Sequence, residues 1–355
     1  MVLVPFYKLQ PTFFNMQRLS LFLLALASSI SAYAVRLPAV INSHMVLQRD
    51  MQVPIWGWGE AGEKISVHFA GQKKATMAGK NGEWMVKLDK LEANASPSVL
   101  TVKGNNEIKL ENVLVGEVWI CSGQSNMEWH VRQCANPQEE IAKANYSKIR
   151  LFDVPGHTVH PLPQREGKGS WQVCSSDSIA RFSATGYYFG RRIHLSLGVP
   201  VGLIGSNWGG TRIEPWTTLD GFKSVSELSE QAKNVAAYTK DTKVNGRTPS
   251  AIYNSMVHPL TPYALRGAIW YQGESNGNEG VTYYQKKHAL VKGWRKAFQN
   301  PNLGFYWVQL CNFRKPNVME VKDPKKEESR PEGGDGWAKL REAQTQALDL
   351  KHTGM

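Results

Sequence analysis

A serine in a glycine-containing turn is the first residue whose surroundings suggest chemistry. The stretch Gly-Gln-Ser-Asn-Met at positions 123–127 follows an apolar run, Val113 to Ile120, that predicts a buried strand. A serine on a tight strand-to-helix turn exposes its hydroxyl and leaves its own amide free, which is how nucleophilic serines are presented. Ser125 fits this arrangement better than Ser122, although position 127 is Met where the familiar pattern has Gly. The alternative is a plain helix cap.

Two further predicted strands end in loops suited to binding a developing negative charge. The run Val199 to Ile204 leads to Gly209 and Gly210, whose amides could approach a substrate oxygen as an oxyanion hole requires. A simple turn also uses two glycines. The run from 267 to 271 leads to Gln272, whose side-chain amide could donate to the same oxygen. Because ligands of open parallel sheets bind beyond the carboxyl ends of the strands, we expect the three loops to meet.

Polar side chains in the same loops are candidates for holding a substrate. We assign substrate binding to Asn126, Arg212, Glu274 and Asn276. For Arg212 there is an alternative, because it either lines a sugar pocket or pairs with Glu214. Glu274 orients either a ligand or its own loop.

The strands and helices that must position these residues are predicted by two different sequence patterns. From residue 35 to about 112, short alternating segments broken by glycines predict a small antiparallel β-sandwich module. After residue 112, continuous apolar runs alternate with amphipathic stretches, which predicts an α/β domain with a parallel sheet between helices over 113–355. The expected helices cover 183–197, 283–298 and 338–348. The charged stretch 314–336, rich in Pro and Gly, predicts a surface loop.

Residues 1–34 are typical of an export signal. An apolar run over 19–27 is preceded by Lys8 and Arg18 and followed by Ala-Tyr-Ala at 32–34, the small-x-small pattern of a cleavage site. The run is short for a membrane span. We therefore expect an exported protein, whether secreted, periplasmic or in a lysosome-like compartment, with no membrane span after cleavage. A buried N-terminal helix is the alternative.

Charge and cysteine content exclude some classes of partner. The formal net charge of the 355 residues is +12, but the basic residues are scattered and no basic block suggests binding to nucleic acid. The surface charge suits acidic glycans instead. The four cysteines lack the C-x-x-C spacing of a zinc site. In an oxidising compartment we expect one bridge, Cys134 to Cys174, with Cys121 a buried free thiol. Nothing in the sequence indicates the oligomeric state.

Three motifs, in this order and spacing, resemble the sialate O-acetylesterase family of SGNH hydrolases. They are Gly-Gln-Ser-Asn-Met-Glu-Trp at 123–129, Asn-Trp-Gly-Gly-Thr at 207–211 and Trp-Tyr-Gln-Gly-Glu-Ser-Asn at 270–276. The stretches 47–49 and 53–57 resemble the N-terminal β module of that family. The resemblance implies an SGNH-hydrolase three-layer fold, with Ser125 as nucleophile. It implies an oxyanion hole made by the Ser125 amide, Gly210 (or Gly209) and Gln272.

The reaction implied by the resemblance is removal of O-acetyl groups from sugars, above all from O-acetylated sialic acids, through an acetyl-enzyme. A histidine takes the serine proton and an aspartate orients that histidine. No metal or organic cofactor is needed. Two other functions remain open: removal of acetyl groups from xylan or another polysaccharide, and a catalytically impaired or carbohydrate-binding remnant.

One departure from the family concerns the catalytic Asp and His. The motif resembling Asp-Ile-His-Pro that carries them does not occur in this sequence. The segment from Arg341 to Met355 resembles a family stretch that precedes the motif, so we expect the Asp and His to lie beyond residue 355. Asp349 and His352 satisfy Asp-x-x-His formally and are the alternative. We expect the other histidines after Ser125 to be structural.

Overall fold

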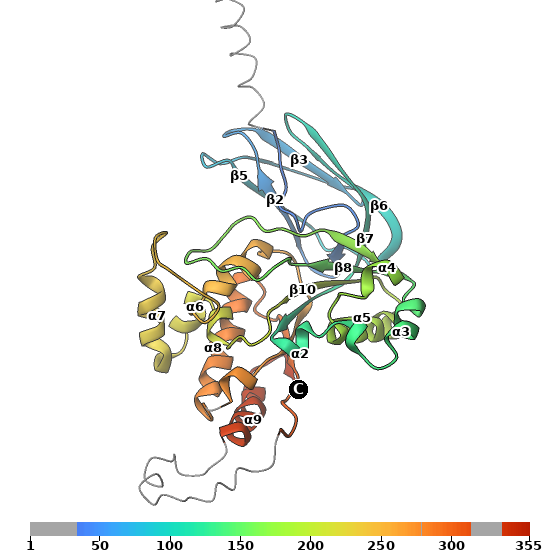
Figure 1. Ribbon diagram of the computed structural model, residues 1–355. Coiled ribbons are helices and arrows are strands. Elements are labelled where there is room, and N and C mark those ends of the chain that lie inside the picture. Colours follow the sequence, from blue (N-terminus) through green and yellow to red (C-terminus); the bar gives the residue numbers. More distant parts are fainter. Residues whose placement is uncertain (1–33, 278, 314–335) are drawn as a thin grey trace, which may run out of the picture.

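The computed structural model describes residues 34–277, 279–313 and 336–355 (Figure 1). The export signal expected over 1–34 therefore lies outside the described residues, except for Ala34, and so does nearly all of the loop expected over 314–336. Within the described ranges, no helix combines the length and the apolar character needed to cross a membrane.

The N-terminal strands pair as the alternating sequence predicts. Strands β2 and β5 form an antiparallel pair, and β3 pairs antiparallel with both β4 and β6. Inward residues of the two groups, such as Ile55 and Val67, are fully buried in one core. The bounds of these strands are β1 (Val46–Gln48), β2 (Val53–Trp58), β3 (Lys64–Phe69), β4 (Gln72–Met77), β5 (Glu83–Leu88) and β6 (Asn94–Lys103).

The second half of the chain forms the predicted parallel sheet. Its order is β13-β12-β11-β7-β10-β8-β9, and every neighbouring pair is parallel except β8 with β9. The strands are β7 (Glu107–Gly123), β8 (Tyr146–Asp153), β9 (Trp171–Cys174), β10 (Val201–Asn207), β11 (Gly267–Tyr271), β12 (Gly304–Trp307) and β13 (Thr353–Gly354).

Helices connect these strands and cover them. The three helices expected from amphipathic periodicity are confirmed as α5, α8 and α9, with ends shifted by one or two residues. The helices are α2 (Ser125–Glu128), α3 (Pro137–Lys143), α4 (Ser176–Ile179), α5 (Ala184–Leu197), α6 (Leu219–Lys223), α7 (Ser229–Ala236), α8 (Thr282–Ala297) and α9 (Gly336–Gln346).

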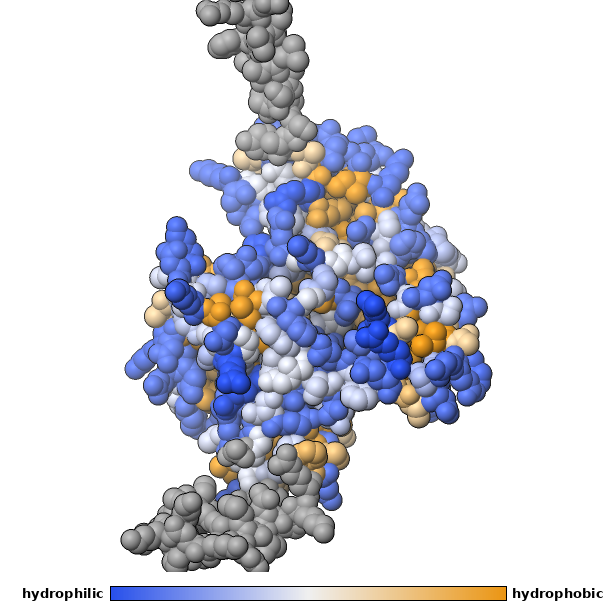
Figure 2. All heavy atoms as spheres, viewed as in Figure 1, coloured by the Kyte–Doolittle hydropathy of each residue, from blue (hydrophilic) through white to orange (hydrophobic). Residues whose placement is uncertain are grey.

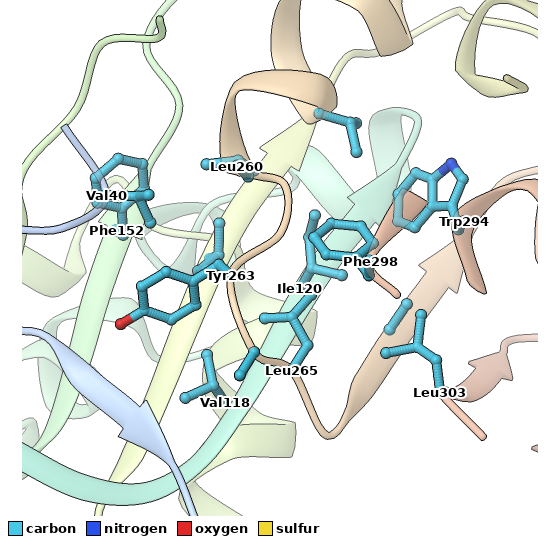
Figure 3. Close-up of a cluster of buried hydrophobic side chains, with 14 of the residues drawn as sticks. Val40, Val118, Ile120, Phe152, Leu260, Tyr263, Leu265, Trp294, Phe298 and Leu303 are labelled. Carbon is cyan, nitrogen blue, oxygen red and sulfur yellow. The ribbon is translucent and has the colours of Figure 1, made fainter. Parts of the chain in front are cut away.

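The period of two along β7 separates the two faces of the sheet. Trp119 and Cys121 belong to the core cluster that includes α5, whereas Val118 and Ile120 belong to the cluster that includes α8. Figure 3 shows Val118 and Ile120 in one apolar cluster with Trp294 of α8. Helices therefore cover both faces, as in an SGNH-like three-layer fold, and the face shown in Figure 2 is mainly hydrophilic with separate apolar patches.

Strand β7 belongs to both parts of the molecule. Its first half pairs with β6 and β1, and its second half pairs with β10 and β11. The boundary expected at residue 112 therefore falls inside a continuous strand, and the division into 35–112 and 113–355 stays a prediction about separate folding units. Midway along β7, buried Glu117 accepts from Arg49 at 2.6 Å and from Arg266 at 2.8 Å. Burial raises the pKa of Glu117, but the two arginines outweigh burial and lower it.

The cysteines do not behave entirely as expected. All four lie in the described residues and all are free, so the predicted Cys134–Cys174 bridge is wrong. Cys174 is buried in β9, where burial raises the pKa of its thiol to about 11. Cys134 is half-buried, with its Sγ 3.7 Å from the carbonyl of His130. Cys121 is a buried free thiol, as predicted.

One lysine of α8 is buried without a hydrogen-bond partner among the described residues. Lys287 is fully buried, and no acceptor in the described residues bonds its Nζ. Its Nζ lies 4.9 Å from the ring centre of Trp307, 5.3 Å from that of Tyr283 and 5.6 Å from that of Trp270. Aromatic faces favour the ammonium form, but burial prevails and lowers the pKa of Lys287 well below its ordinary value. The folded protein therefore carries a cost that an apolar side chain would not have.

We predict that Lys287→Met raises the free energy of unfolding near pH 7 by roughly 1 to 3 kcal/mol, because it removes a buried unpaired amine. The unfolded lysine holds its proton up to about pH 10.4, whereas the folded one releases it at lower pH. The stability of the wild-type protein should therefore rise with pH between the folded and the unfolded pKa of Lys287. The difference in Tm between Lys287→Met and wild type should narrow toward pH 10. Lys292→Met, on the exposed side of α8, is the control and should change stability by less than about 0.5 kcal/mol. Equal or lower stability for Lys287→Met would contradict the prediction.

Candidate active site

The turn between β7 and α2 presents Ser125 as the sequence predicts. Ser125 is the first residue of α2 and is exposed, whereas Ser122 is fully buried in β7. Gly123 has φ 141°, and a Cβ there would lie 2.1 Å from the carbonyl oxygen of Tyr271. That oxygen accepts from the amide of Gln124 at 2.9 Å. The turn is tight because two parallel strands approach each other closely at their ends, and only glycine fits the approach.

The first turn of α2 leaves an amide available at the serine. The amides of Met127 and Glu128 both donate to the carbonyl of Gln124 at 2.9 Å. Within the described residues no acceptor bonds the amide of Ser125. An exposed hydroxyl and a free amide on one residue are what a serine nucleophile needs, because the oxygen that it attacks becomes negatively charged beside that amide.

The glycine loop after β10 reaches the same place. Asn207 lies opposite Gly123 in the β10–β7 register, so the loop begins beside the serine turn. The amide of Gly209 donates to Glu128 Oε2 at 2.6 Å. Gly210 has φ 74°, and no acceptor in the described ranges bonds its amide. Of the two glycines left open by the sequence, Gly210 is therefore the one with an amide free to bind an oxyanion.

Gln272 and Asn276 lie near these loops but inside the protein. Both are buried, at 0% and 1% exposure, and Gln272 Nε2 donates to Asn276 Oδ1 at 2.7 Å and to the carbonyl of Thr211 at 3.2 Å. Gln272 Oε1 accepts from Tyr283 at 2.8 Å. Both N–H groups of Gln272 are thus occupied. Its role as an oxyanion donor stays a prediction that requires these bonds to exchange, while the observed contacts brace the two loops.

Asn276 completes a buried polar network with charged residues. Its Nδ2 donates to Glu214 and Glu279 at 3.1 and 3.0 Å, and Lys286 bonds Glu214 at 2.6 Å. Burial raises the pKa of Glu214, but Lys286 and Asn276 outweigh it, so the pKa is lowered. Arg212 pairs with Glu214 at 3.4 Å and also bonds Glu279. Of the two roles considered for Arg212, pairing with Glu214 is the one observed, and contact with a sugar stays a prediction.

Asn126 and Glu274 meet at the rim of the site. Asn126 Nδ2 donates to Glu274 Oε1 at 2.5 Å, which joins the nucleophile turn to the loop after β11. Both side chains are only partly buried. Substrate binding by these two residues stays a prediction, and their mutual bond shows that Glu274 at least orients its own surroundings.

A small cavity adjoins α2, the helix that begins at Ser125, and the sequence did not point to most of its lining residues. Its volume is about 80 Å³, and Glu128 lies on it one helical turn after the serine. Glu128 Oε1 bonds His157 Nε2 at 2.8 Å, and the His157 ring stacks on Trp208 with centroids 4.7 Å apart. The lining residues are Glu128, His130, Asp153, Val154, Gly156, His157, Arg181, Ser183 and Asn207.

Asp153 carries an unusual proton affinity in this cavity. Burial and, to a smaller extent, the charge of Glu128 raise the pKa of Asp153 to about 6. Asp153 as a residue is exposed to solvent, while protein atoms crowd its carboxyl group beside the cavity. Asp153 ends β8, so the rule of searching strand ends would have found it. The strand was missed because only four consecutive residues of β8 are buried.

The alternative catalytic pair at the C-terminal end is excluded by topology. Strands β7, β11, β12 and β13 are parallel, Ser125 follows β7, and Asp349 and His352 precede β13. The pair therefore lies at the opposite end of the sheet from Ser125. The carbonyl of His352 accepts from Phe305 near the start of β12, and Asp349 bonds His288 at 2.9 Å instead. In the described part of the chain, no histidine bonds Ser125.

No metal site emerges in the part of the chain that the structure describes, where no three His, Cys, Asp or Glu side chains are grouped to hold an ion. The absence of a required metal or organic cofactor stays a prediction. The site thus consists of an exposed serine, two free amides and an acidic cavity, at the carboxyl end of a parallel sheet between helices. These features are typical of the SGNH-like class of serine hydrolases.

Comparison with known proteins agrees with this class. Residues 115–333 match the family model described as carbohydrate esterase, sialic acid-specific acetylesterase. The chain is 30% identical to sialate O-acetylesterase of Rattus norvegicus over 86% of its length, and 32% identical to that of Homo sapiens over 76%. It covers 65% and 54% of those two relatives.

A solved structure is similar along most of the chain. The crystal structure of a carbohydrate acetylesterase from Xanthomonas citri matches 90% of this chain and 68% of that one, with 34% identity and a TM-score of 0.77. The chain belongs to the carbohydrate esterase family of sialic acid-specific acetylesterases.

We predict that Gly123→Ala destabilises the protein by about 3 kcal/mol or more, because the added Cβ meets a backbone oxygen that cannot turn away. The control is Gly71→Ala, where φ is 74° but nothing lies within 4 Å of the added carbon. The control should cost only about 1 to 2 kcal/mol of backbone strain. Urea unfolding of both variants measures the difference, and equal losses would show that the close approach to Tyr271 is unimportant.

A second prediction concerns the proton of Asp153. A raised pKa means that the folded state binds the proton more tightly than the unfolded state, so stability is lost as pH rises from about 4 through 6. The Tm of Asp153→Asn should therefore exceed that of wild type by a margin that grows between pH 4 and pH 7 and then levels off. Adding Glu128→Gln should reduce the margin only in part, because burial is the larger cause. A margin independent of pH would contradict the assignment.

Proposed function

We propose that this chain carries the nucleophile and the oxyanion hole of a serine esterase that removes O-acetyl groups from sugars, with O-acetylated sialic acids as substrates. The observation that supports it best is the exposed Ser125 on its strand-to-helix turn, flanked by its own free amide and by that of Gly210. The names of the relatives point to the same substrate class. An acetylated carbohydrate is the partner that the proposal requires.

The proposed chemistry proceeds through an acetyl-enzyme. Ser125 Oγ attacks the acetyl carbonyl, and its proton passes to a base. The base then gives the proton to the sugar oxygen as the bond between that oxygen and the acetyl carbon breaks. The carbonyl oxygen becomes negative and accepts from the amides of Ser125 and Gly210. Water then attacks the acetyl-serine and releases acetate. Each step forms one bond to the carbonyl carbon as another breaks, so no metal or redox group is needed.

No histidine among the described residues bonds Ser125, so none of them is in place to act as the base. Loss of a triad member typically costs about 10⁴-fold in rate and leaves the contribution of the oxyanion hole and binding. We therefore expect weak ester hydrolysis by these 355 residues alone. Because weak hydrolysis is expected, the test also examines a second candidate function, that of a carbohydrate-binding protein with impaired catalysis.

The test measures both labelling and turnover. We expect a fluorophosphonate to label Ser125, and slow release of acetate from O-acetylated sialic acid to exceed release from acetylated xylan. Ser125→Ala should abolish labelling and reduce turnover to background, while Ser122→Ala, the buried neighbour, should retain both. Saturable glycan binding without labelling would replace the esterase with the binding function. Undiminished turnover by Ser125→Ala would refute the nucleophile.

A further inference from the structure

A larger groove adjoins the small cavity next to α2. The groove has a volume of about 630 Å³, within the range of pockets that hold small ligands. Asp153 and Arg181 line both spaces, so the two spaces adjoin at these residues. The groove is lined by Leu151, Asp153, Pro155, Gly169, Ser170, Gln172, Asp177, Ser178, Ala180, Arg181 and Phe182.

Backbone pairing holds Arg181 at a set position relative to the nucleophile. The amide of Arg132 donates to the carbonyl of Ala180, and the amide of Val131 donates to that of Phe182, both at 3.1 Å. His130 and Ser183 form an isolated antiparallel bridge. The segment that carries Arg181 thus runs alongside the residues that directly follow α2. A ligand that reaches both Ser125 and Arg181 would meet a rigid frame.

Arg181 is a cation without an anionic partner at this junction. Its side chain is exposed, and no carboxylate within the described ranges forms an ion pair with it. It is also the only Lys or Arg among the residues that line either space. A planar guanidinium with free N–H groups binds a carboxylate through two parallel hydrogen bonds.

We propose that Arg181 binds the carboxylate of an acidic acetylated sugar and so makes the site selective for anionic substrates over neutral ones. The inference rests on the proposed function of Ser125 and names the residue that would distinguish sialic acids from xylan. The acetyl group lies at Ser125, the sugar ring spans the small cavity, and the carboxylate meets Arg181 at the entrance to the groove.

The charged groups that face Arg181 are compatible with an anion there. Glu128 already accepts from the amide of Gly209 and bonds His157, so both of its carboxylate oxygens are engaged within the protein. Asp153 has a raised pKa. Burial, followed by the charges of Arg132 and then Arg181, outweighs Glu128 and lowers the pKa of His130, which leaves Arg181 as the cation that faces a ligand. Asp177 lies along the groove beyond the junction.

Equilibrium binding to Ser125→Ala tests the inference without depending on turnover. The probes are N-acetylneuraminic acid and its methyl ester, which share one ring and differ in charge. With Arg181 intact we expect the acid to bind about 10-fold more tightly than the ester, which corresponds to roughly 1.4 kcal/mol. Arg181→Ala should remove the preference and Arg181→Lys should retain part of it. Arg192→Ala, an exposed arginine of α5, is the control and should retain all of it.

Equal affinity for acid and ester with Arg181 intact, no saturable binding of either, or an unchanged preference in Arg181→Ala would each overturn the inference. Esterase activity without a preference for charge would leave the proposed function standing while removing the role of Arg181. If the preference for the acid depends on Arg181 but the fluorophosphonate does not label Ser125, the role of Arg181 stands and the proposed esterase function does not.

Discussion

Strand β7 joins the two parts of the molecule, and the rest of the structure is arranged around it. Its 17 residues pair with β6 and β1 in the first half and with β10 and β11 in the second half. Its first half completes the antiparallel β module, and its second half is the middle strand of the parallel sheet. A continuous strand transmits its direction and twist from one half to the other. The buried Glu117 at the junction shows how closely the halves are joined, because two arginines from separate segments converge on its carboxylate.

The position of Ser125 follows from the same strand. Where β7 ends, β10 and β11 lie on its two sides and their loops are brought against the serine turn. The absent side chain of Gly123 allows contact with the Tyr271 backbone, and buried Gln124 accepts from the amides of Gly273 and Ser275. Backbone contacts therefore set the geometry of Ser125. Such contacts hold a site more rigidly than flexible side chains do.

A carboxylate lies close to Ser125, on Glu128 of the same helix. Glu128 uses one carboxylate oxygen to hold Gly209 and the other to hold His157, which in turn packs on Trp208. This arrangement turns the glycine loop so that one of its two amides is occupied and the other is free. The charge of Glu128 also contributes to the raised pKa of its neighbour Asp153. Catalytic geometry and local proton affinity are thus coupled through one side chain.

The sequence by itself determined the class of fold, the longer helices of the parallel domain and the place of Ser125 on a strand-to-helix turn. Hydrophobic periodicity is a local property, so β11 was predicted with the bounds observed and α5, α8 and α9 to within two residues, and the strand-end rule led directly to Ser125. Only the tertiary structure decided how side chains from distant segments use their donors. Gln272 looked free to bind an oxyanion, yet packing against Asn276 and Tyr283 occupies its amide. The choice between the amides of Gly209 and Gly210, the position of Arg181 at the cavity and the absence of the expected disulfide were also decided this way. All three depend on contacts between residues far apart in the chain, which no local pattern encodes.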